Sequence, residues 1–106
     1  MANFIKVAEK AEIEPGTGKT LDVAGTPVAL FNVDGDYFAI HNTCLHRQGP
    51  LGEGQLSGNV VTCPLHGWQY DVRTGQAVQN PSICVAKYEV KVEGENVFVS
   101  EHPVQG

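Results

Sequence analysis

The sequence has no run of Lys or Arg. Seven basic residues stand against twelve acidic ones, and the formal net charge at pH 7 is −5. A nucleic-acid backbone would be repelled by this balance, so the sequence predicts no nucleic-acid partner. An acidic surface instead favours a basic patch on another protein, where opposite charge speeds the encounter more than it tightens the complex.

Long hydrophobic runs are also missing. No apolar stretch approaches the roughly 20 residues of a membrane span, and the first seven residues contain no basic leader before a long apolar segment. We therefore expect a soluble, cytoplasmic protein with no membrane contact. The 106 residues suffice for one compact domain but not two, so the sequence predicts one domain over 1–106 and a monomer.

Sustained helical periodicity is absent, apart from at most one turn around 7–11. Short segments rich in Val, Ile, Phe and Tyr, separated by Gly and Pro, indicate an all-β fold. The predicted strands cover 4–8, 19–23, 27–32, 36–41, 59–62, 69–72, 88–92 and 96–100. Residues 42–58 and 63–68 break this pattern and are predicted to be loops, where functional residues often lie.

Cysteine is scarce, and its count of three is odd. Two of the three lie beside histidines, which makes a disulfide framework a poor explanation. Residues 44–46 read Cys-Leu-His and residues 63–66 read Cys-Pro-Leu-His, with sixteen residues between the two groups. Two thiolates and two imidazoles suit either a tetrahedral zinc ion or an iron–sulfur cluster in which His replaces Cys on one iron. The spacing alone leaves both open.

The surrounding residues favour the cluster. Residues 44–54 read Cys-Leu-His-Arg-Gln-Gly-Pro-Leu-Gly-Glu-Gly, and residues 63–75 read Cys-Pro-Leu-His-Gly-Trp-Gln-Tyr-Asp-Val-Arg-Thr-Gly. This stretch resembles the Rieske family, and most of all the soluble Rieske ferredoxins that serve bacterial oxygenases. The resemblance implies an antiparallel β-sandwich with a small cluster-binding subdomain of two loops, within about residues 42–76, holding one Rieske-type 2Fe-2S cluster.

The resemblance also assigns roles to individual residues. It implies that Cys44 and Cys63 bind the inner iron as thiolates, and that His46 and His66 bind the outer iron near the surface. The residues expected to shape the loops, or to shield the cluster and dock a partner, are Leu45, Arg47, Gln48, Gly49, Pro50, Pro64, Leu65, Gly67, Trp68 and Tyr70.

Several positions depart from the membrane-anchored branch of the family. Gly49 and Leu65 stand where that branch has two further cysteines that form a clamping disulfide, and Trp68 stands where it has a Ser that bonds a bridging sulfide. Tyr70 matches a Tyr that bonds a cysteine sulfur. We expect a reduction potential in the low part of the Rieske range, about −150 to +300 mV, with Tyr70 acting to raise it.

The resemblance implies a carrier of single electrons from a flavin-dependent reductase to a terminal oxygenase, and not an enzyme in its own right. Two alternatives remain open: the small Rieske-like subunit of an NAD(P)H nitrite reductase, and a zinc-stapled structural module without redox function. A hydrolase or transferase is not indicated, because no nucleophile motif or paired carboxylates are present.

Four other features have simpler interpretations. Cys84 is expected to be a small apolar residue packed beneath the cluster loops, and His102 a solvated side chain. His41 is expected to be a strand-end residue or one that supports the ligands without binding iron. Residues 16–20, Gly-Thr-Gly-Lys-Thr, resemble part of a phosphate-binding loop, but Ile13 stands where that motif requires its first Gly. We therefore interpret 16–20 as a turn.

Overall fold

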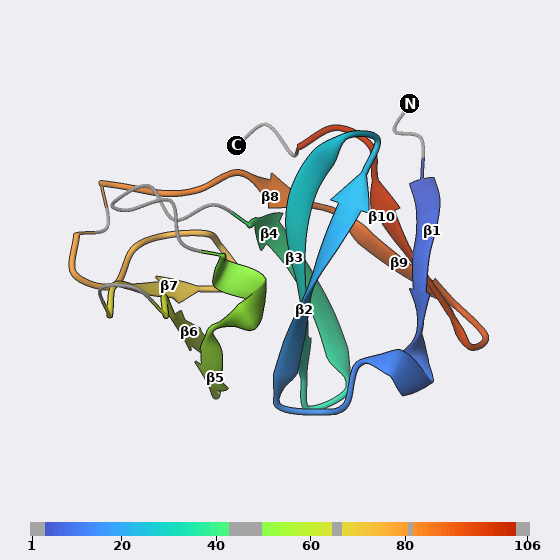
Figure 1. Ribbon diagram of the computed structural model, residues 1–106, viewed down its shortest axis with the longest axis horizontal. Coiled ribbons are helices and arrows are strands. Elements are labelled where there is room, and N and C mark those ends of the chain that lie inside the picture. Colours follow the sequence, from blue (N-terminus) through green and yellow to red (C-terminus); the bar gives the residue numbers. More distant parts are fainter. Residues whose placement is uncertain (1–3, 43–49, 65–66, 81, 104–106) are drawn as a thin grey trace.

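The structure, a computed structural model, describes residues 4–42, 50–64, 67–80 and 82–103. Within these ranges the chain consists of short strands and two 3-10 turns, η1 (Lys10–Glu12) and η2 (Leu51–Glu53), and contains no α-helix (Figure 1). The all-β prediction is confirmed. No helix in the described part of the chain is long and apolar enough to cross a bilayer.

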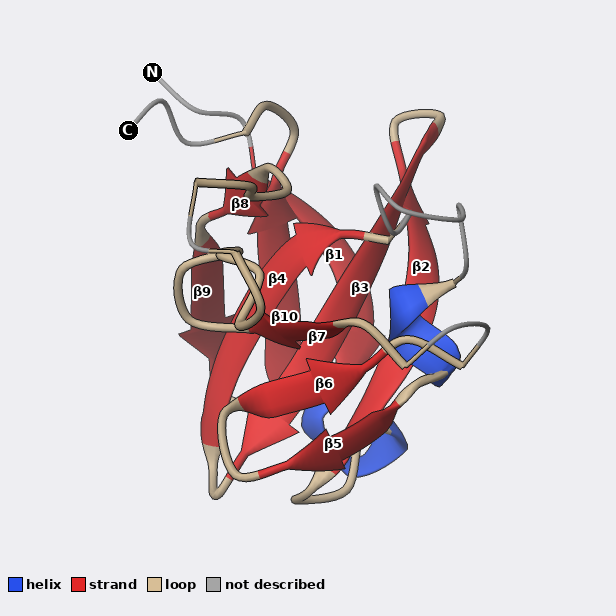
Figure 2. Cartoon of the chain, turned by 90° about the vertical axis from the view of Figure 1, so that its left-hand side faces the viewer, coloured by secondary structure: helices blue, strands red, loops and turns tan. Residues whose placement is uncertain are grey.

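All strand pairs are antiparallel, and they form three sheets with the orders β1-β10-β9, β2-β3-β4-β8 and β5-β6-β7. The strands are β1 (Phe4–Glu9), β2 (Thr17–Val23), β3 (Thr26–Val33), β4 (Asp36–His41), β5 (Gln55–Ser57), β6 (Val60–Thr62), β7 (Gln69–Asp71), β8 (Lys87–Tyr88), β9 (Val90–Glu93) and β10 (Asn96–Ser100). In Figures 1 and 2 the β2-β3-β4-β8 sheet lies between the other two.

The central sheet is buried on both faces. Because successive side chains of a strand point to opposite faces, Val28 and Leu30 of β3 pack on one side, and Ala29 and Phe31 pack on the other. All four are fully buried. One continuous apolar stretch of β3 thus serves two separate hydrophobic cores.

The scaffold core lies between the central sheet and the β1-β10-β9 sheet, and its buried members are Ala8, Ile13, Val23, Val28, Leu30, Ala39, Tyr88, Val97 and Val99. The site core lies between the central sheet and the β5-β6-β7 sheet, and its buried members are Ala29, Phe31, Ile40, Leu51, Val61, Cys63, Tyr70, Val72, Ala77 and Val85. A fully buried large apolar side chain contributes about 1.5–3 kcal/mol, so each core can hold its outer sheet in place.

The strands differ from the prediction at two places. β5 lies inside the predicted loop 42–58; it has three residues with one apolar side chain, Leu56, and glycines on both flanks. The predicted strand 88–92 is divided between β8 and β9, because the chain passes from one sheet to another at Glu89. Ser100 fixes this crossing: its Oγ accepts a hydrogen bond from Glu89 N at 3.1 Å, and its N donates one to Glu89 O at 2.9 Å.

Candidate metal centre

Of the four expected ligands, Cys63 lies in the described part of the chain. Cys44, His46 and His66 lie outside the described residues, as do Leu45, Arg47, Gln48, Gly49 and Leu65. The structure therefore shows how the two expected cluster loops are held at their bases, on the end of the molecule formed by the β5-β6-β7 sheet (Figure 1).

The first loop leaves the central sheet at Asn42 and returns at Pro50. Leu51 N donates a 2.6 Å hydrogen bond to Asn42 O, so the chain enters and leaves the loop at one place. The side chain of Asn42 adds a second closure, because its Oδ1 accepts hydrogen bonds from Gly52 N at 2.8 Å and Thr20 Oγ1 at 3.0 Å. Asn42 is only 6% exposed. Backbone and side chain together fix the base of this loop to β2 and η2.

The second loop is closed in the same manner between β6 and β7. Cys63 N donates to Trp68 O at 2.7 Å, and Gly67 N donates to Cys63 O at 3.1 Å. Gly67 has φ +75°, in the left-handed region that favours glycine, and Pro64 is exposed. This tight turn begins at Cys63, one of the expected ligands.

The Cys63 side chain is 1% exposed and is not in a disulfide. It belongs to the site core together with Leu51 from the base of the first loop and Tyr70 of β7. A buried free thiol can be an inert core residue, but a thiolate in such apolar surroundings requires a compensating cation. The position fits the inner, cysteine-bound iron of a Rieske cluster, because the thiol faces the core at the base of a loop.

A third segment, residues 74–86, lies beside the start of β7, and its part beyond residue 76 was not predicted as part of the site. Val78 N donates to Gln69 O at 2.8 Å, and the side-chain Oε1 of Gln79 accepts from Gln69 N at 3.1 Å. Val78 is half exposed at 50%, one of the two large exposed apolar side chains among the described residues. The sequence does contain a signal for this segment, because residues 74–86 include no charged residue. In the structure much of the segment is nevertheless exposed, which is unusual for an uncharged stretch.

The prediction for Cys84 is wrong. Cys84 is exposed, whereas Val85 is buried and Ile83 packs partly against the site core. Extended backbone alternates its side chains between two faces, so the residue between two inward-facing neighbours points to solvent. The apolar sequence around Cys84 gave no indication of which residues face outward.

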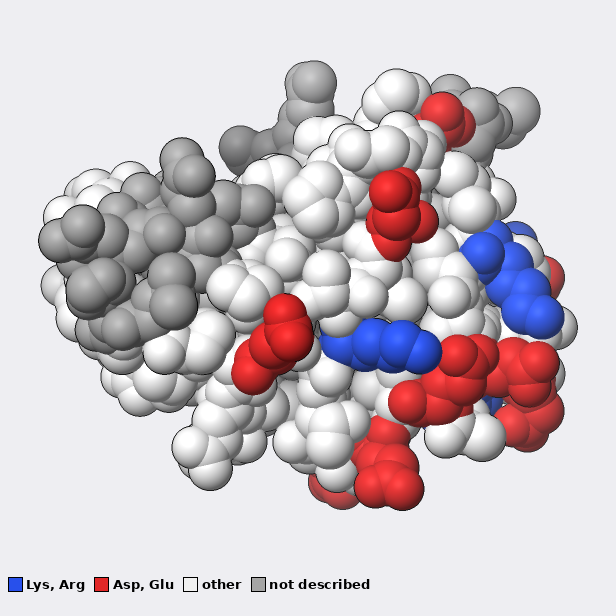
Figure 3. All heavy atoms as spheres, viewed as in Figure 1, with Lys and Arg blue, Asp and Glu red and all other residues white. Residues whose placement is uncertain are grey.

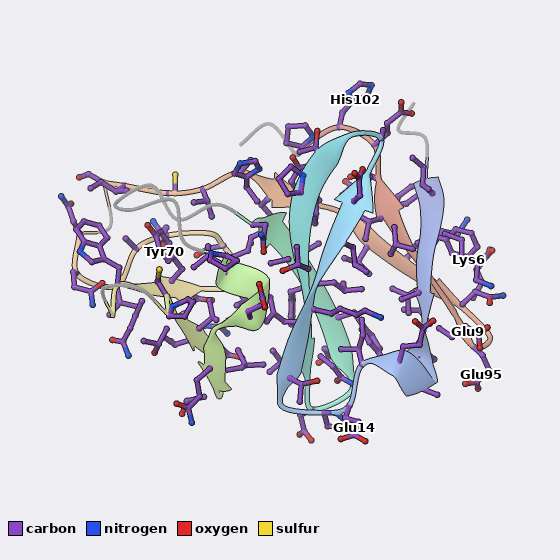
Figure 4. All side chains as sticks on the ribbon, in the orientation of Figure 1. Lys6, Glu9, Glu14, Tyr70, Glu95 and His102 are labelled. Carbon is purple, nitrogen blue, oxygen red and sulfur yellow. The ribbon has the colours of Figure 1, made fainter. Side chains whose placement is uncertain are left out.

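Tyr70 is completely buried in the site core, and Trp68 packs partly buried against it. The Tyr70 backbone pairs with Val61 of β6 and forms a bridge to Ala77 of the third segment, so Tyr70 lies between β6 and that segment (Figure 4). Among the residues that the structure describes, no group of three His, Cys, Asp or Glu side chains converges as a further metal site.

His41 and His102 agree with their simple interpretations, because His41 ends β4 and is partly buried, and His102 is exposed. The interpretation of 16–20 as a turn is wrong for most of the segment: Gly16 lies in a turn with φ +83°, but β2 already begins at Thr17. The segment is therefore a strand start and not a phosphate-binding loop before a helix. Lys19 forms an ion pair with Glu12 at 3.2 Å.

Charge near the candidate site is compensated locally. The Asp71 carboxylate accepts hydrogen bonds from Arg73 Nε at 3.3 Å and Nη2 at 3.2 Å, and also from Arg73 N at 2.9 Å. These hydrogen bonds, with the attraction of the opposite charge, raise the pKa of the Arg73 guanidinium above its ordinary value. The turn after β7 therefore carries an internally paired charge.

Comparison with known proteins agrees with this geometry. The Rieske [2Fe-2S] domain family matches residues 3–101. The biphenyl dioxygenase ferredoxin subunit of Pseudomonas sp. (strain KKS102) is 38% identical over 99 residues, which cover 91% of this chain and 90% of that protein.

Solved structures are similar over nearly the whole chain. A chain of the complex of reduced oxygenase and oxidized ferredoxin in carbazole 1,9a-dioxygenase has a TM-score of 0.88 and 30% identity, covering 97% of both chains. A structure from Mycobacterium tuberculosis, described as a candidate small subunit of an NADH-dependent nitrite reductase, has a TM-score of 0.87 with coverages of 94% and 96%. Its identity is 20%, so that likeness shows the fold alone.

Proposed function

The chain belongs to the Rieske [2Fe-2S] family, and we propose that this ferredoxin takes single electrons from a flavoprotein reductase and passes them to a terminal oxygenase. It is an electron carrier with a Rieske-type 2Fe-2S cluster, and not a catalyst in its own right. The observation that carries the choice of partners is the 38% identity, over 91% of the chain, to the ferredoxin subunit of a dioxygenase.

In this proposal Cys44 and Cys63 hold the inner iron as thiolates, and His46 and His66 hold the outer iron. The burial of Cys63 in the site core supports the inner position for the thiolates. When bound, the cluster supplies a one-electron couple that is neutral when oxidised, with neutral imidazoles, and carries one negative charge when reduced. Backbone N–H groups of the two closed loops would stabilise that added charge.

The proposal extends to the organisation of the chain. Residues 1–106 form one Rieske domain, with the cluster-binding part at about 42–76, and the protein acts as a cytoplasmic monomer. The residues around the outer iron that would meet a partner are Leu45, Arg47, Gln48, Pro50 and Leu65. Gly49 and Leu65 leave no disulfide clamp, so we expect a potential in the low part of about −150 to +300 mV.

The first test of the proposal is low-temperature EPR of the dithionite-reduced protein, with iron, zinc and acid-labile sulfide assayed on the same sample. We expect an average g value below that of the free electron, with two iron and two sulfide per chain, as a 2Fe-2S cluster requires. Zinc with no EPR signal would mean a structural module, and a large subunit that copurifies stably would favour the nitrite reductase alternative.

The two described cysteines provide matched variants for the ligand assignment. Cys63→Ser should give a colourless, less stable protein, because the buried ligand is lost and folding is coupled to the metal. Cys84→Ser makes the same change on an exposed residue and should keep the full iron content and EPR signal. A coloured and equally stable Cys63→Ser protein would contradict the assignment.

The partners are tested by single-turnover mixing. The reduced protein should be reoxidised by a purified terminal oxygenase from the same organism, and the oxidised protein should be reduced by a flavoprotein reductase with its nicotinamide. The Cys84→Ser variant should match the wild-type protein in both reactions. Failure of every such oxygenase to accept the electron would overturn the proposed role while leaving the cluster intact.

A further inference from the structure

The charge of this chain is divided unevenly along the sequence. Residues 37–86 contain Arg47, Arg73, Glu53 and Asp71, which cancel. The remaining residues, 1–36 and 87–106, contain five lysines against ten acidic residues, so they carry the entire net charge of −5. A protein with its charge spread evenly would not show this division.

The fold converts this division into two ends. Residues 37–86 include the β5-β6-β7 sheet, the bases of both loops and the third segment. We call these three parts together the site end. On the face shown in Figure 3, the described atoms at the left-hand, site end are uncharged, and the charged side chains lie over the centre and the right. Figure 4 places Tyr70 at the site end, and Glu9, Glu14 and Glu95 at the lower right.

Three turns bring six of these ten acidic residues together at the opposite end, which we call the acidic end. Lys10 N donates to Glu95 O at 2.8 Å, which joins η1 to the β9–β10 hairpin. Gly16 N donates to Asn32 O at 2.8 Å, which joins the start of β2 to the β3–β4 hairpin. These contacts gather the acidic residues of the three turns, Glu12, Glu14, Asp34, Asp36, Glu93 and Glu95. Lys19 and Lys91 pair with Glu12 and Glu93, so the net negative charge of this end comes from the other four.

The structure describes three of the four charged residues of 37–86, and Arg47 lies outside the described residues. Asp71 and Arg73 neutralise each other through their hydrogen bonds. Glu53 is exposed in η2 and adds one negative charge at the base of the first loop. The exposed and half-exposed side chains described in the second loop and the third segment are uncharged, among them Pro64, Trp68, Val78, Gln79 and Cys84.

We propose that the site end docks against a partner face that is itself apolar and low in charge, and that the charge separation turns the acidic end away from that face. This rests on the proposed function, because it takes the cluster to be held at the site end. A strongly basic partner face would attract the acidic end and hold the cluster away, in a molecule whose longest extent is 35 Å. The negative net charge alone predicts a basic patch on the partner. That prediction requires the negative charge to be spread evenly over the surface of this protein.

Electron transfer at electrodes of defined surface chemistry tests this orientation. The holo-protein is studied by voltammetry at low salt on gold carrying monolayers that end in mixed hydroxyl and methyl groups, in ammonium groups, or in carboxylates. We expect the ammonium surface to adsorb the most protein. Electron transfer per adsorbed molecule should nevertheless be several-fold slower there than on the hydroxyl–methyl surface, because the acidic end would face the ammonium groups and the cluster would lie at the far end of the molecule. Equal or faster transfer on ammonium would overturn the inference alone, whereas protein with no reducible centre would overturn the proposed function as well.

Matched charge variants locate the effect. Gln79→Glu adds one negative charge at the site end and keeps the Oε1 acceptor for Gln69 N, while Glu95→Gln removes one at the acidic end. With hexaammineruthenium(III) as oxidant at low salt, Gln79→Glu should raise the oxidation rate at least about threefold. Glu95→Gln should leave it nearly unchanged. A larger change for Glu95→Gln than for Gln79→Glu would show that the cluster senses the acidic end, and would overturn the inference.

Discussion

The hydroxyl of Thr20 in β2 donates a 3.0 Å hydrogen bond to Asn42 Oδ1, at the base of the first cluster loop. The two residues are 22 positions apart in the sequence. The same oxygen accepts from Gly52 N, where the loop returns to the scaffold. One buried amide side chain therefore connects the central sheet to both ends of the loop expected to carry Cys44 and His46.

Asn42→Ala should destabilise the holo-protein by about 1–3 kcal/mol, because the buried Gly52 N loses its acceptor. Urea unfolding followed by circular dichroism measures the change, and loss of visible absorbance in the same titration should occur at lower urea. Asn80→Ala is the control, since Asn80 Oδ1 accepts from Ser82 N in an exposed turn. Its cost should stay within about 0.5 kcal/mol, and an equal cost for both variants would show that the buried bond is unimportant.

Gly52→Ala should be more damaging still. A Cβ at this position would overlap Thr20 Oγ1 and lie 2.7 Å from Thr20 N, which is backbone and cannot rotate away. Overpacking of this kind costs about 1–3 kcal/mol, and here it would also separate η2 from β2. Gly58→Ala is the comparison, because φ is +61° there but nothing lies within 4 Å of the added carbon. If thermal unfolding gave Gly58→Ala the larger loss, backbone conformation rather than close approach would be the dominant effect.

Much of the fold could be predicted from the sequence because most strands carry their own signal. The apolar run in β3 and the turn at Asp34 and Gly35 are local features, and the structure confirms the strands on both sides. β5 could not be predicted, because it is defined by pairing with β6 rather than by its own composition. The division of β8 from β9 likewise depends on a tertiary contact, the hydrogen bonds of Ser100 to Glu89.

The expected ligands could be named from a local motif, whereas the supports of the site could not. Cys63 belongs to a compact run whose residue types are themselves informative, and its burial agrees with the expected inner position. Asn42 gives no such signal, because an Asn at a strand end is common and only the fold brings Thr20 and Gly52 to its side chain. Cys84 shows the same limit, since facing inward or outward depends on the path of the third segment.

Ser100→Ala should cost about 1–3 kcal/mol of unfolding free energy. Ser100 is 1% exposed, and its Oγ accepts from Glu89 N and donates to His102 O, so the variant leaves both groups without this partner. Ser82→Ala, on an exposed residue, should be nearly neutral. The cluster spectrum of Ser100→Ala should be unchanged, because the crossing lies in the scaffold. A shifted spectrum would contradict this separation of scaffold from site.

Tyr70→Phe should keep the cluster and lower its reduction potential. Tyr70 is completely buried in the same core as Cys63, and the family resemblance implies a hydrogen bond from its hydroxyl to a cysteine sulfur. A net hydrogen bond is worth about 1 kcal/mol, which corresponds to a decrease of roughly 40 mV for a one-electron couple. Potentiometric titration followed by circular dichroism measures it. Tyr37→Phe is the control, because Tyr37 packs against the scaffold core. An unchanged potential in Tyr70→Phe would exclude the bond.

Glu12 should make stability depend on pH in acid. Its carboxylate accepts a hydrogen bond from Glu9 N at 2.9 Å and pairs with Lys19 at 3.2 Å, and these contacts lower its pKa from 4.5. Because the folded-state pKa lies below the unfolded one, the stabilisation is present above 4.5 and is lost as pH falls through the folded value. The difference in Tm between wild type and Glu12→Gln should therefore be largest near neutral pH and shrink below 4.5.

Glu14→Gln removes the same charge from the same turn without breaking the contacts to Glu9 and Lys19. If both variants gave the same pH profile, general acidic repulsion rather than the Glu12 hydrogen bonds would account for the dependence.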